Sequence, residues 1–291
     1  MAVAWQMYKV ILRLCSPLHI GCGKIGNLQR TYPYVTGRVM WGALTMRLTR
    51  DKCKGNEIND SSIYQEVGEQ VHRELAFTYF YPVLSSGNHY QIEWPWKDQR
   101  AFRYRFLSSY AGTALDYPQQ SAARGMLRET EFISPYTLDE GKRVFLQGYI
   151  FEKKGCTLSW QEAVKRLQFG GERSYGWGKV KPVAINPCRE DDKLFDKGIK
   201  FLKSDERPRV CLPAKARLLA HTVAAENPFA DGPIEPLAGR EWRPNQKGNA
   251  YVGQHIAFNE ICFAPGSVLV NNDNHYDFRI DPFGVWRLSE K

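Results

Sequence analysis

A glycine-rich stretch in the middle of the chain has the residue types to bind phosphate and to stack on bases. Its glycines lie within nine residues: Gly170, Gly171, Gly176 and Gly178. Glycine lets a backbone approach a phosphate closely, and successive amides can form an anion-binding nest. The same stretch carries Arg173, Tyr175 and Lys179. The pattern predicts an RNA contact, although a glycine-rich turn that only joins a helix to a strand would contain the same glycines.

A second group of candidates follows the first expected strand. His19, Gly21 and Lys24 lie in or beside a turn over residues 16–23. Histidine can act as a general acid or base, so His19 is the fallback catalytic residue. Alternatively, its ring hydrogen-bonds the backbone of its own turn. Residues 21–26 also match the G-x-G-x-x-G pattern, but no helix opens within that segment, so we expect no nucleotide cofactor.

Four arginines add positive charge to the expected RNA-binding surface. Arg38 and Arg47 belong to an expected helix over 37–50, which has apolar residues at helical spacing. Arg103 and Arg105 alternate with aromatic residues over 100–106, which predicts a strand. Its basic face would pair with phosphates, and the alternative is an ordinary amphipathic strand.

Strand and helix patterns alternate along residues 1–185. The order βαββαβ predicts an α+β, ferredoxin-like (RRM-like) domain, in which one face of an antiparallel sheet stays free for RNA. Residues 86–130 are predicted to be an inserted hairpin region. Residues 186–291 contain shorter strand patterns between turns, so we expect a β-rich C-terminal extension or small second domain there.

Composition limits the class of protein. The chain has 291 residues and a formal net charge of +9, which favours a polyanionic partner such as nucleic acid. The absence of a long apolar run and of a secretory signal predicts a protein without membrane contact. The seven cysteines form no Cys-x-x-Cys pair. We therefore expect a reduced, cytoplasmic protein without a metal site.

Three segments, in order, resemble the RAMP superfamily of CRISPR-associated RNA-binding proteins. Residues 16–23 are similar to the family's LHIGsG segment, and residues 34–44 to its iPGSSlKGalR helix start. Residues 169–179 are similar to the family's glycine-rich loop. The resemblance spans residues 7–185. Backbone subunits of the family carry a projecting hairpin, and the resemblance makes the expected strand over 100–106 the candidate for it. It implies a subunit that holds the guide RNA of a CRISPR effector complex, most like type III.

The resemblance leaves a binding role and a cleaving role open. Family members that line the guide often cut target RNA with an Asp in the loop before the first helix, whereas members that bind the guide's 5′ handle usually do not cut. Here the segment 24–33 contains no Asp or Glu. We expect a non-catalytic, handle-binding subunit in antiviral defence, with the large signalling subunit and backbone subunits as partners. The alternative is an endoribonuclease, metal-dependent or metal-independent, that processes guide RNA or cuts target RNA.

Overall fold

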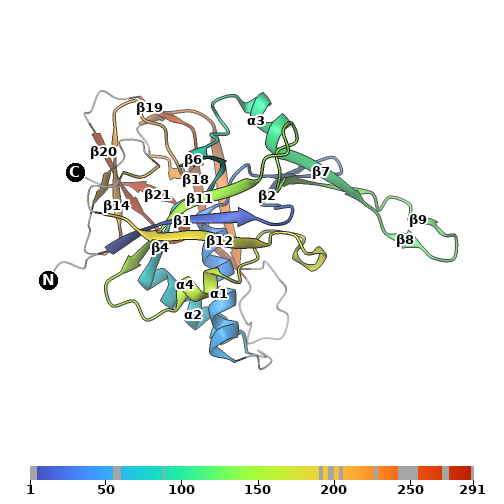
Figure 1. Cartoon of the computed structure of the whole chain (residues 1–291), viewed down its shortest axis with the longest axis horizontal. Helices are drawn as coiled ribbons and strands as arrows, with labels where there is room; N and C mark the ends of the chain where they lie inside the picture. The colour runs from blue at the N-terminus through green and yellow to red at the C-terminus, as the bar shows by residue number, and fades with distance from the viewer. Residues whose placement is uncertain are drawn as a thin grey trace.

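The first strand, β1 (Trp5–Leu14), carries buried side chains on both faces. The computed structural model describes residues 5–54, 60–87, 89–189, 193–195, 200–202, 206–225, 229–241, 255–270 and 275–289. Val10 and Leu12 pack in the core beneath the helices, whereas Trp5 and Met7 pack in a second core with C-terminal residues. The strand therefore lies in the central sheet of a layered structure, drawn in Figure 1.

The central sheet has the ferredoxin-like strand order. It runs β12 (Val180–Pro187), β1, β11 (Val144–Lys153), β5 (Tyr81–Ser86), β6 (His89–Ile92), and β4 (Leu75–Phe77) also pairs with β11. Neighbouring strands are antiparallel. Helices α1 (Gly37–Lys52) and α2 (Ser61–Glu74) follow β1, and α4 (Trp160–Val164) precedes β12. The predicted α+β class is confirmed, and the order of elements is the expected βαββαβ.

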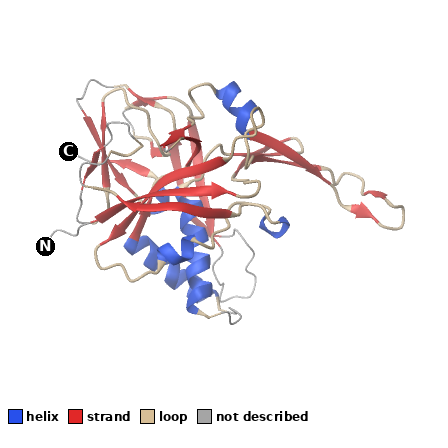
Figure 2. Ribbon diagram, in the orientation of Figure 1, coloured by secondary structure: helices blue, strands red, loops and turns tan. Residues whose placement is uncertain are grey.

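The helices cover one face of the central sheet (Figure 2). Met40, Leu44 and Leu48 of α1 recur at helical spacing and are buried in this layer. Burial of each such side chain contributes about 1.5–3 kcal/mol. Packing stabilises α1 more than capping does, because its N-cap residue Thr36 makes no side-chain cap hydrogen bond.

The described part of the C-terminal region forms a second, seven-stranded sheet. Its order is β13 (Lys200–Leu202), β14 (Arg209–Pro213), β20 (His275–Ile280), β21 (Trp286–Leu288), β15 (Thr222–Val223), β18 (His255–Phe263) and β17 (Ile234–Glu241). A short pair, β16 (Ala230–Asp231) and β19 (Val268–Leu269), and the 3-10 turn η2 (Pro282–Gly284) accompany it. The predicted β-rich character of this region agrees with the structure.

This second sheet covers the face of the central sheet that was predicted to be free for RNA. Tyr79, Tyr81 and Phe151 from the first part share one buried core with Leu212 and Phe278 from the second. The prediction of an open face was wrong because both surfaces are apolar, and removing them from water stabilises the packed arrangement. This face of the central sheet is therefore not open to a ligand.

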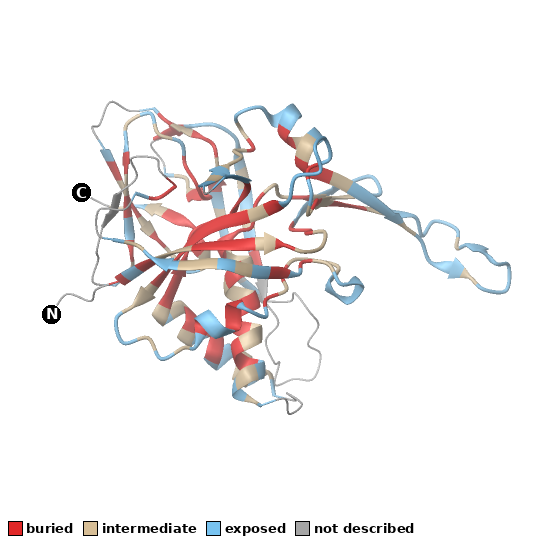
Figure 3. Cartoon of the chain, in the orientation of Figure 1, coloured by how far each residue is buried: buried red, intermediate tan, exposed pale blue. Residues whose placement is uncertain are grey.

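Residues 107–133 form a long arm that projects from the body (Figure 1). Its strands are β7 (Leu107–Gly112), β8 (Leu115–Asp116), β9 (Ser121–Ala122) and β10 (Arg128–Ile133). At its base, β7 and β10 join β2 (Gly21–Ile25) and β3 (Leu28–Thr31) in one sheet. The outer half of the arm is exposed (Figure 3). The predicted loop over 24–33 thus contains a β-hairpin, and the projecting hairpin begins at residue 107.

Residues 100–106, predicted as a strand, instead belong to a helix, α3 (Gln99–Phe106). The Asp98 carboxylate caps it by accepting a hydrogen bond from the Ala101 amide at 2.9 Å. Phe102 and Phe106 lie one turn apart, and their rings stack at 4.7 Å. Residues that alternate over seven positions also recur every fourth position, so the pattern fits both structures. The cap favours the helix.

Two further predictions concern the chain as a whole. Within the described ranges, no helix is both long enough and apolar enough to span a membrane. The seven cysteines, all described, form no disulfide with one another.

Candidate nucleic-acid interface

A groove of about 690 Å³ lies where the glycine-rich loop, the first turn and the start of α1 meet the C-terminal region. We call it the central groove. Six residues predicted as RNA contacts line it: His19, Gly21, Arg38, Gly170, Gly171 and Arg173. Pro236, Leu237 and Ala238 of β17 also line it. The structure therefore brings both predicted groups of residues together, and the C-terminal region completes the groove.

The glycine-rich loop packs directly on the first turn. A methyl group on Gly170 would lie 2.4 Å from the His19 carbonyl oxygen, and one on Gly178 would lie 1.8 Å from the Phe169 carbonyl oxygen. The Gly171 amide donates to the His19 carbonyl at 2.8 Å, and the Gly178 amide donates to a carbonyl of the first turn at 2.7 Å. These glycines permit close backbone packing, and the Gly171 and Gly178 amides are already bonded within the protein.

His19 stabilises this turn from inside. The residue is only 7% exposed, and its Nδ1 lies 2.6 Å from the backbone carbonyl oxygen of Glu131. Because a carbonyl only accepts, Nδ1 is the donor, and Nε2 lies under Gly21. The ring therefore bonds backbone, as the alternative from the sequence expected, but the acceptor belongs to β10 and not to the histidine's own turn. The buried His19 ring is not exposed to a ligand, which argues against the fallback catalytic role.

The exposed end of the glycine-rich loop carries its charged and aromatic side chains. Arg173 opens the 3-10 turn η1 (Arg173–Tyr175), and its Nη1 lies 3.1 Å from Met46 Sδ. Tyr175 is 69% exposed, and its ring centre lies 5.6 Å from the Arg128 guanidinium. Gly176 and Lys179 are exposed beside it. These groups are accessible to a ligand at the mouth of the central groove and beyond it.

The two arginines predicted on α1 have different surroundings. The Arg38 guanidinium lies 5.3 Å from the ring centres of both Phe258 and Phe283. Arg38 therefore lines the central groove with its guanidinium packed against two aromatic rings. Arg47 lies further along α1 and pairs with Asp51 at 2.5 Å. Arg47 does not line the groove.

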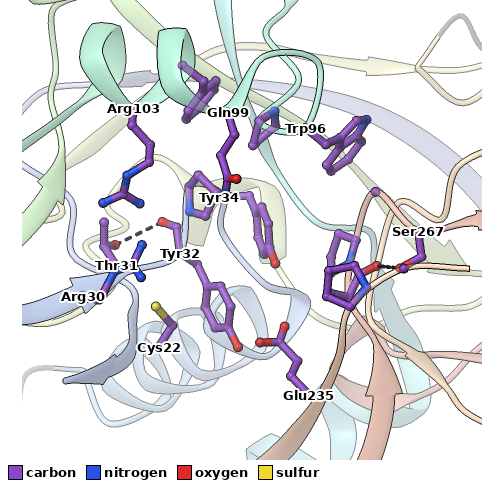
Figure 4. Close-up of a pocket in the computed structure, with 18 of the residues that line it drawn as sticks. Cys22, Arg30, Thr31, Tyr32, Tyr34, Trp96, Gln99, Arg103, Glu235 and Ser267 are labelled. Carbon is purple, nitrogen blue, oxygen red and sulfur yellow. Dashed lines mark hydrogen bonds between the residues drawn. The ribbon is translucent and has the colours of Figure 1, made fainter. Parts of the chain in front are cut away.

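A second hollow of about 770 Å³ lies beside the first, at the β2–β3 hairpin (Figure 4). We call it the hairpin pocket. Its basic residues are Lys24, Arg30, Arg103 and Arg217, and its aromatic residues are Tyr32, Tyr34, Trp96 and Phe102. Cys22 and Tyr32 line both hollows. Basic and aromatic side chains around one cavity are the groups that contact the phosphates and bases of single-stranded RNA.

Two of the pocket's arginines meet at the buried carboxylate of Glu131. Arg103 Nη2 donates to Oε1, and Arg30 Nε lies 3.8 Å from Oε2. The Thr31 amide also donates to Oε2, at 3.0 Å. One carboxylate thus fixes both guanidiniums at the pocket wall and offsets part of their positive charge.

The Arg105 side chain lies outside the hairpin pocket, among different carboxylates from those that contact Arg103. Three carboxylates approach its guanidinium: Asp139 at 2.8 Å, Glu140 at 3.6 Å and Glu93 at 3.9 Å. It lines a separate depression beside α3. Its charge is therefore largely neutralised within the protein, and its surroundings do not favour an RNA contact.

A buried chain of hydrogen bonds connects the central sheet to the edge of the hairpin pocket. His221 Nε2 lies 2.5 Å from Glu235 Oε1, and His221 Nδ1 lies 2.7 Å from the Tyr79 hydroxyl. An ionised carboxylate only accepts, so His221 donates to Glu235 and accepts from Tyr79. Burial, and next the Glu235 charge, raises the pKa of Tyr32 well above its ordinary value. Tyr32 therefore keeps its proton and remains a donor at the pocket.

Five of these pocket residues were not among the candidates predicted from the sequence: Arg30, Tyr32, Trp96, Arg217 and Glu235. A strand pattern over 28–32 was the available signal for Arg30 and Tyr32, in a segment interpreted as a loop. Arg217 and Glu235 lie in residues 186–291, outside the family resemblance, and only tertiary packing brings them to the pocket.

Comparison with known proteins gives one family and several solved structures. The model of the RAMP superfamily matches residues 11–181. No curated protein matches the chain. A chain in the cryo-EM structure of "the Type III-B Cmr-beta bound to cognate target RNA and AMPPnP, state 1" is 13% identical, with a TM-score of 0.46 over 90% of this chain and 85% of that chain. A chain of Type III-B Cmr-beta in the apo state is 9% identical, with a TM-score of 0.39 over 62% and 96%. A chain of Type III-B Cmr-beta bound to cognate target RNA is 13% identical, with a TM-score of 0.41 over 60% and 96%.

The family match extends from within β1 to the start of β12, which is more than half of the chain. It includes the first turn, the start of α1 and the glycine-rich loop. These are the segments whose sequences resemble the family, and they meet at the central groove. The chain belongs to the RAMP superfamily.

Proposed function

We propose that this chain is an RNA-binding subunit of a type III CRISPR effector complex, acting in antiviral defence in the cytoplasm. The family resemblance supports the class of complex. The observation that carries the proposal is the meeting of the glycine-rich loop, the first turn and α1 at a groove beside a basic, aromatic pocket. The ligand we propose is the guide RNA, with its 5′ handle in the central groove and the hairpin pocket.

Three cations are placed to contact the backbone of such an RNA. Lys24 and Arg173 are exposed, and neither has an ion pair within the described ranges. Arg38 lines the groove between two phenylalanine rings. Each contact between a cation and a phosphate releases counterions, so binding weakens as salt rises. Tyr32 and Trp96 offer ring surfaces for bases.

We propose that the subunit binds RNA without cutting it and needs no cofactor to do so. His19 is buried and its Nδ1 is bonded to backbone. The segment 24–33 supplies no carboxylate. The hairpin pocket does contain Glu235, which accepts a hydrogen bond from His221. Asp231 also lines this pocket, so the endoribonuclease alternative has two carboxylates to test directly, by Asp231→Asn and Glu235→Gln.

The arm supports a role beside other subunits. Three of its side chains are largely exposed: Tyr117 by 81%, Tyr110 by 66% and Leu115 by 60%. Exposed apolar side chains on a projecting hairpin favour contact with other macromolecules. We propose that the arm contacts a backbone subunit or the large signalling subunit. We also propose residues 1–185 as the RNA-binding unit and residues 186–291 as the extension that completes its groove.

Binding of labelled guide RNA, measured by fluorescence anisotropy at several salt concentrations, tests the proposal. Lys24→Ala and Arg173→Ala should each reduce the salt slope by about 0.7, which is about a fivefold loss of affinity near 0.1 M salt. Lys165→Ala is the matched control, because Lys165 is an exposed cation on the helical layer, away from both hollows.

Two further comparisons test the finer parts of the proposal. A guide with a scrambled 5′ handle should bind at least tenfold more weakly than the native guide, and equal affinity would refute the handle-binding role. RNA cleavage that is lost in Asp231→Asn or Glu235→Gln would refute the non-catalytic role and make the chain an endoribonuclease.

A further inference from the structure

We propose that the outer face of the C-terminal sheet holds a zinc ion, bound by Cys211, His275 and Asp277. One donor atom from each of these side chains lies within 4.8 Å of the other two. A thiolate, an imidazole and a carboxylate are the three kinds of side chain that bind Zn²⁺ in proteins. The site is separate from both RNA-facing hollows, and it does not depend on the proposed function.

Strand register explains why the three ligands meet. β14 and β20 are antiparallel, with Cys211 opposite Asp277 and Pro213 opposite His275. Side chains on one face of an antiparallel pair are close when directly opposite and remain within reach on the diagonal. Val210 and Leu212 of β14 are buried in the core. Because side chains alternate between faces, Cys211 and both β20 ligands lie together on the opposite, outer face.

The distances fit zinc after a small adjustment of side chains. Donor atoms around a tetrahedral zinc ion lie about 3.5 Å apart, given metal–ligand distances of about 2.0–2.3 Å. The 4.8 Å limit between the present donors exceeds that spacing by about 1 Å. Rotation about the side-chain torsions covers such a difference without moving either strand.

The Asp277 carboxylate provides an independent indication of a cation. Its Oδ1 is buried and has no hydrogen-bond partner within the described part of the chain. Burying a carboxylate oxygen away from water costs free energy unless the oxygen accepts a hydrogen bond, pairs with a cation or binds a metal. His275 is exposed and Cys211 is half-buried, so an ion can enter from solvent and meet the carboxylate last.

The ligand set also selects the metal. Thiolate and imidazole favour Zn²⁺, whereas Mg²⁺ and Ca²⁺ prefer oxygen ligands only. Three protein ligands leave the fourth tetrahedral position for water. No local pattern in the sequence indicates the site, because Cys211 and the His-x-Asp pair are far apart along the chain and form no short metal-binding motif.

Cobalt substitution of the full, untagged, metal-free chain tests this site. Co²⁺ in a tetrahedral site with a thiolate ligand should give a charge-transfer band in the near ultraviolet and visible d–d bands, saturating at one equivalent. One equivalent of Zn²⁺ should remove both. Cys211→Ser should abolish the charge-transfer band, and Asp277→Asn should weaken Zn²⁺ binding at least tenfold.

Cys22→Ser and His89→Ala are the matched controls, because both residues are exposed and lie outside the C-terminal sheet. They should leave the spectrum unchanged. Absence of the bands in the unmodified chain would overturn the proposal, and so would unchanged bands in Cys211→Ser. Equal Zn²⁺ affinity in Asp277→Asn and the unmodified chain would remove Asp277 from the ligand set and overturn the three-ligand site.

Discussion

Removing one charge, by Glu131→Gln, should loosen the hairpin pocket and destabilise the chain. The Glu131 side chain is 7% exposed and pairs with Arg103 and Arg30, which are 36% and 34% exposed. Breaking a buried ion pair costs about 3–5 kcal/mol. Partial exposure of both arginines reduces that figure, and glutamine still accepts from the Thr31 amide. We expect a loss of about 2 kcal/mol in the free energy of unfolding.

Thermal unfolding monitored by circular dichroism measures this change. For a chain of this size, about 2 kcal/mol corresponds to a Tm lower by roughly 3–4 °C. Glu140→Gln is the matched control, because Glu140 also pairs with an arginine but is 49% exposed. An exposed pair contributes less than about 1 kcal/mol, so its Tm should change by no more than about 2 °C. Equal Tm values for the two variants would refute the assignment of Glu131 as a buried anchor.

Three further predictions concern stability. Gly178→Ala should lower the free energy of unfolding in urea by at least about 3 kcal/mol, because its methyl group would lie 1.8 Å from the Phe169 carbonyl oxygen. Gly176 lies in open space with a φ of +83°, so Gly176→Ala should lower it by only about 1–2 kcal/mol. Equal losses in the two variants would contradict this prediction. Burial, followed by two nearby guanidiniums, lowers the pKa of His72 in the folded chain to about 4. As the pH falls, this histidine is protonated in the unfolded chain before it is protonated in the folded chain, which favours unfolding. The free energy of unfolding should therefore fall by about 1–3 kcal/mol from pH 6.5 to 4. Urea unfolding of His72→Gln should show a smaller fall, and an identical pH profile would contradict the assignment. Residues 1–185 expressed alone should bind a hydrophobic dye and aggregate, because the shared core loses its C-terminal half; a soluble monomer that binds no dye would refute this.

Local sequence patterns were sufficient for the framework of the first part. The helical spacing of Met40, Leu44 and Leu48 reflects one buried face, so the helix and its orientation follow together. The pattern of β1 indicated a strand, but that strand is buried on both faces, in two different cores. The same patterns could not separate a strand from a helix over 100–106. Seven residues with buried aromatic side chains at positions 102 and 106 fit both periods, and the Asp98 cap was the deciding signal.

Tertiary contacts determined what the sequence could not predict. The second sheet covers the central sheet because apolar surfaces from both halves of the chain exclude water together. Arg103 and Arg105 look equivalent in the sequence, yet one pairs with a buried carboxylate at the pocket and the other with exposed carboxylates outside it. No local pattern records which acidic residue will lie beside a given arginine.

The glycine-rich loop separates two tasks that its sequence combines. Gly170 and Gly178 allow the loop to dock on the first turn, since any side chain there would meet backbone. Arg173 and Tyr175 remain at the exposed end. Substitution of Gly178 should therefore reduce stability and RNA affinity together, whereas Arg173→Ala should reduce affinity with an unchanged Tm. Fluorescence anisotropy and thermal unfolding on the same samples separate the effect on RNA affinity from the effect on stability. A lower Tm in Arg173→Ala would show that Arg173 also stabilises the fold and would contradict this assignment.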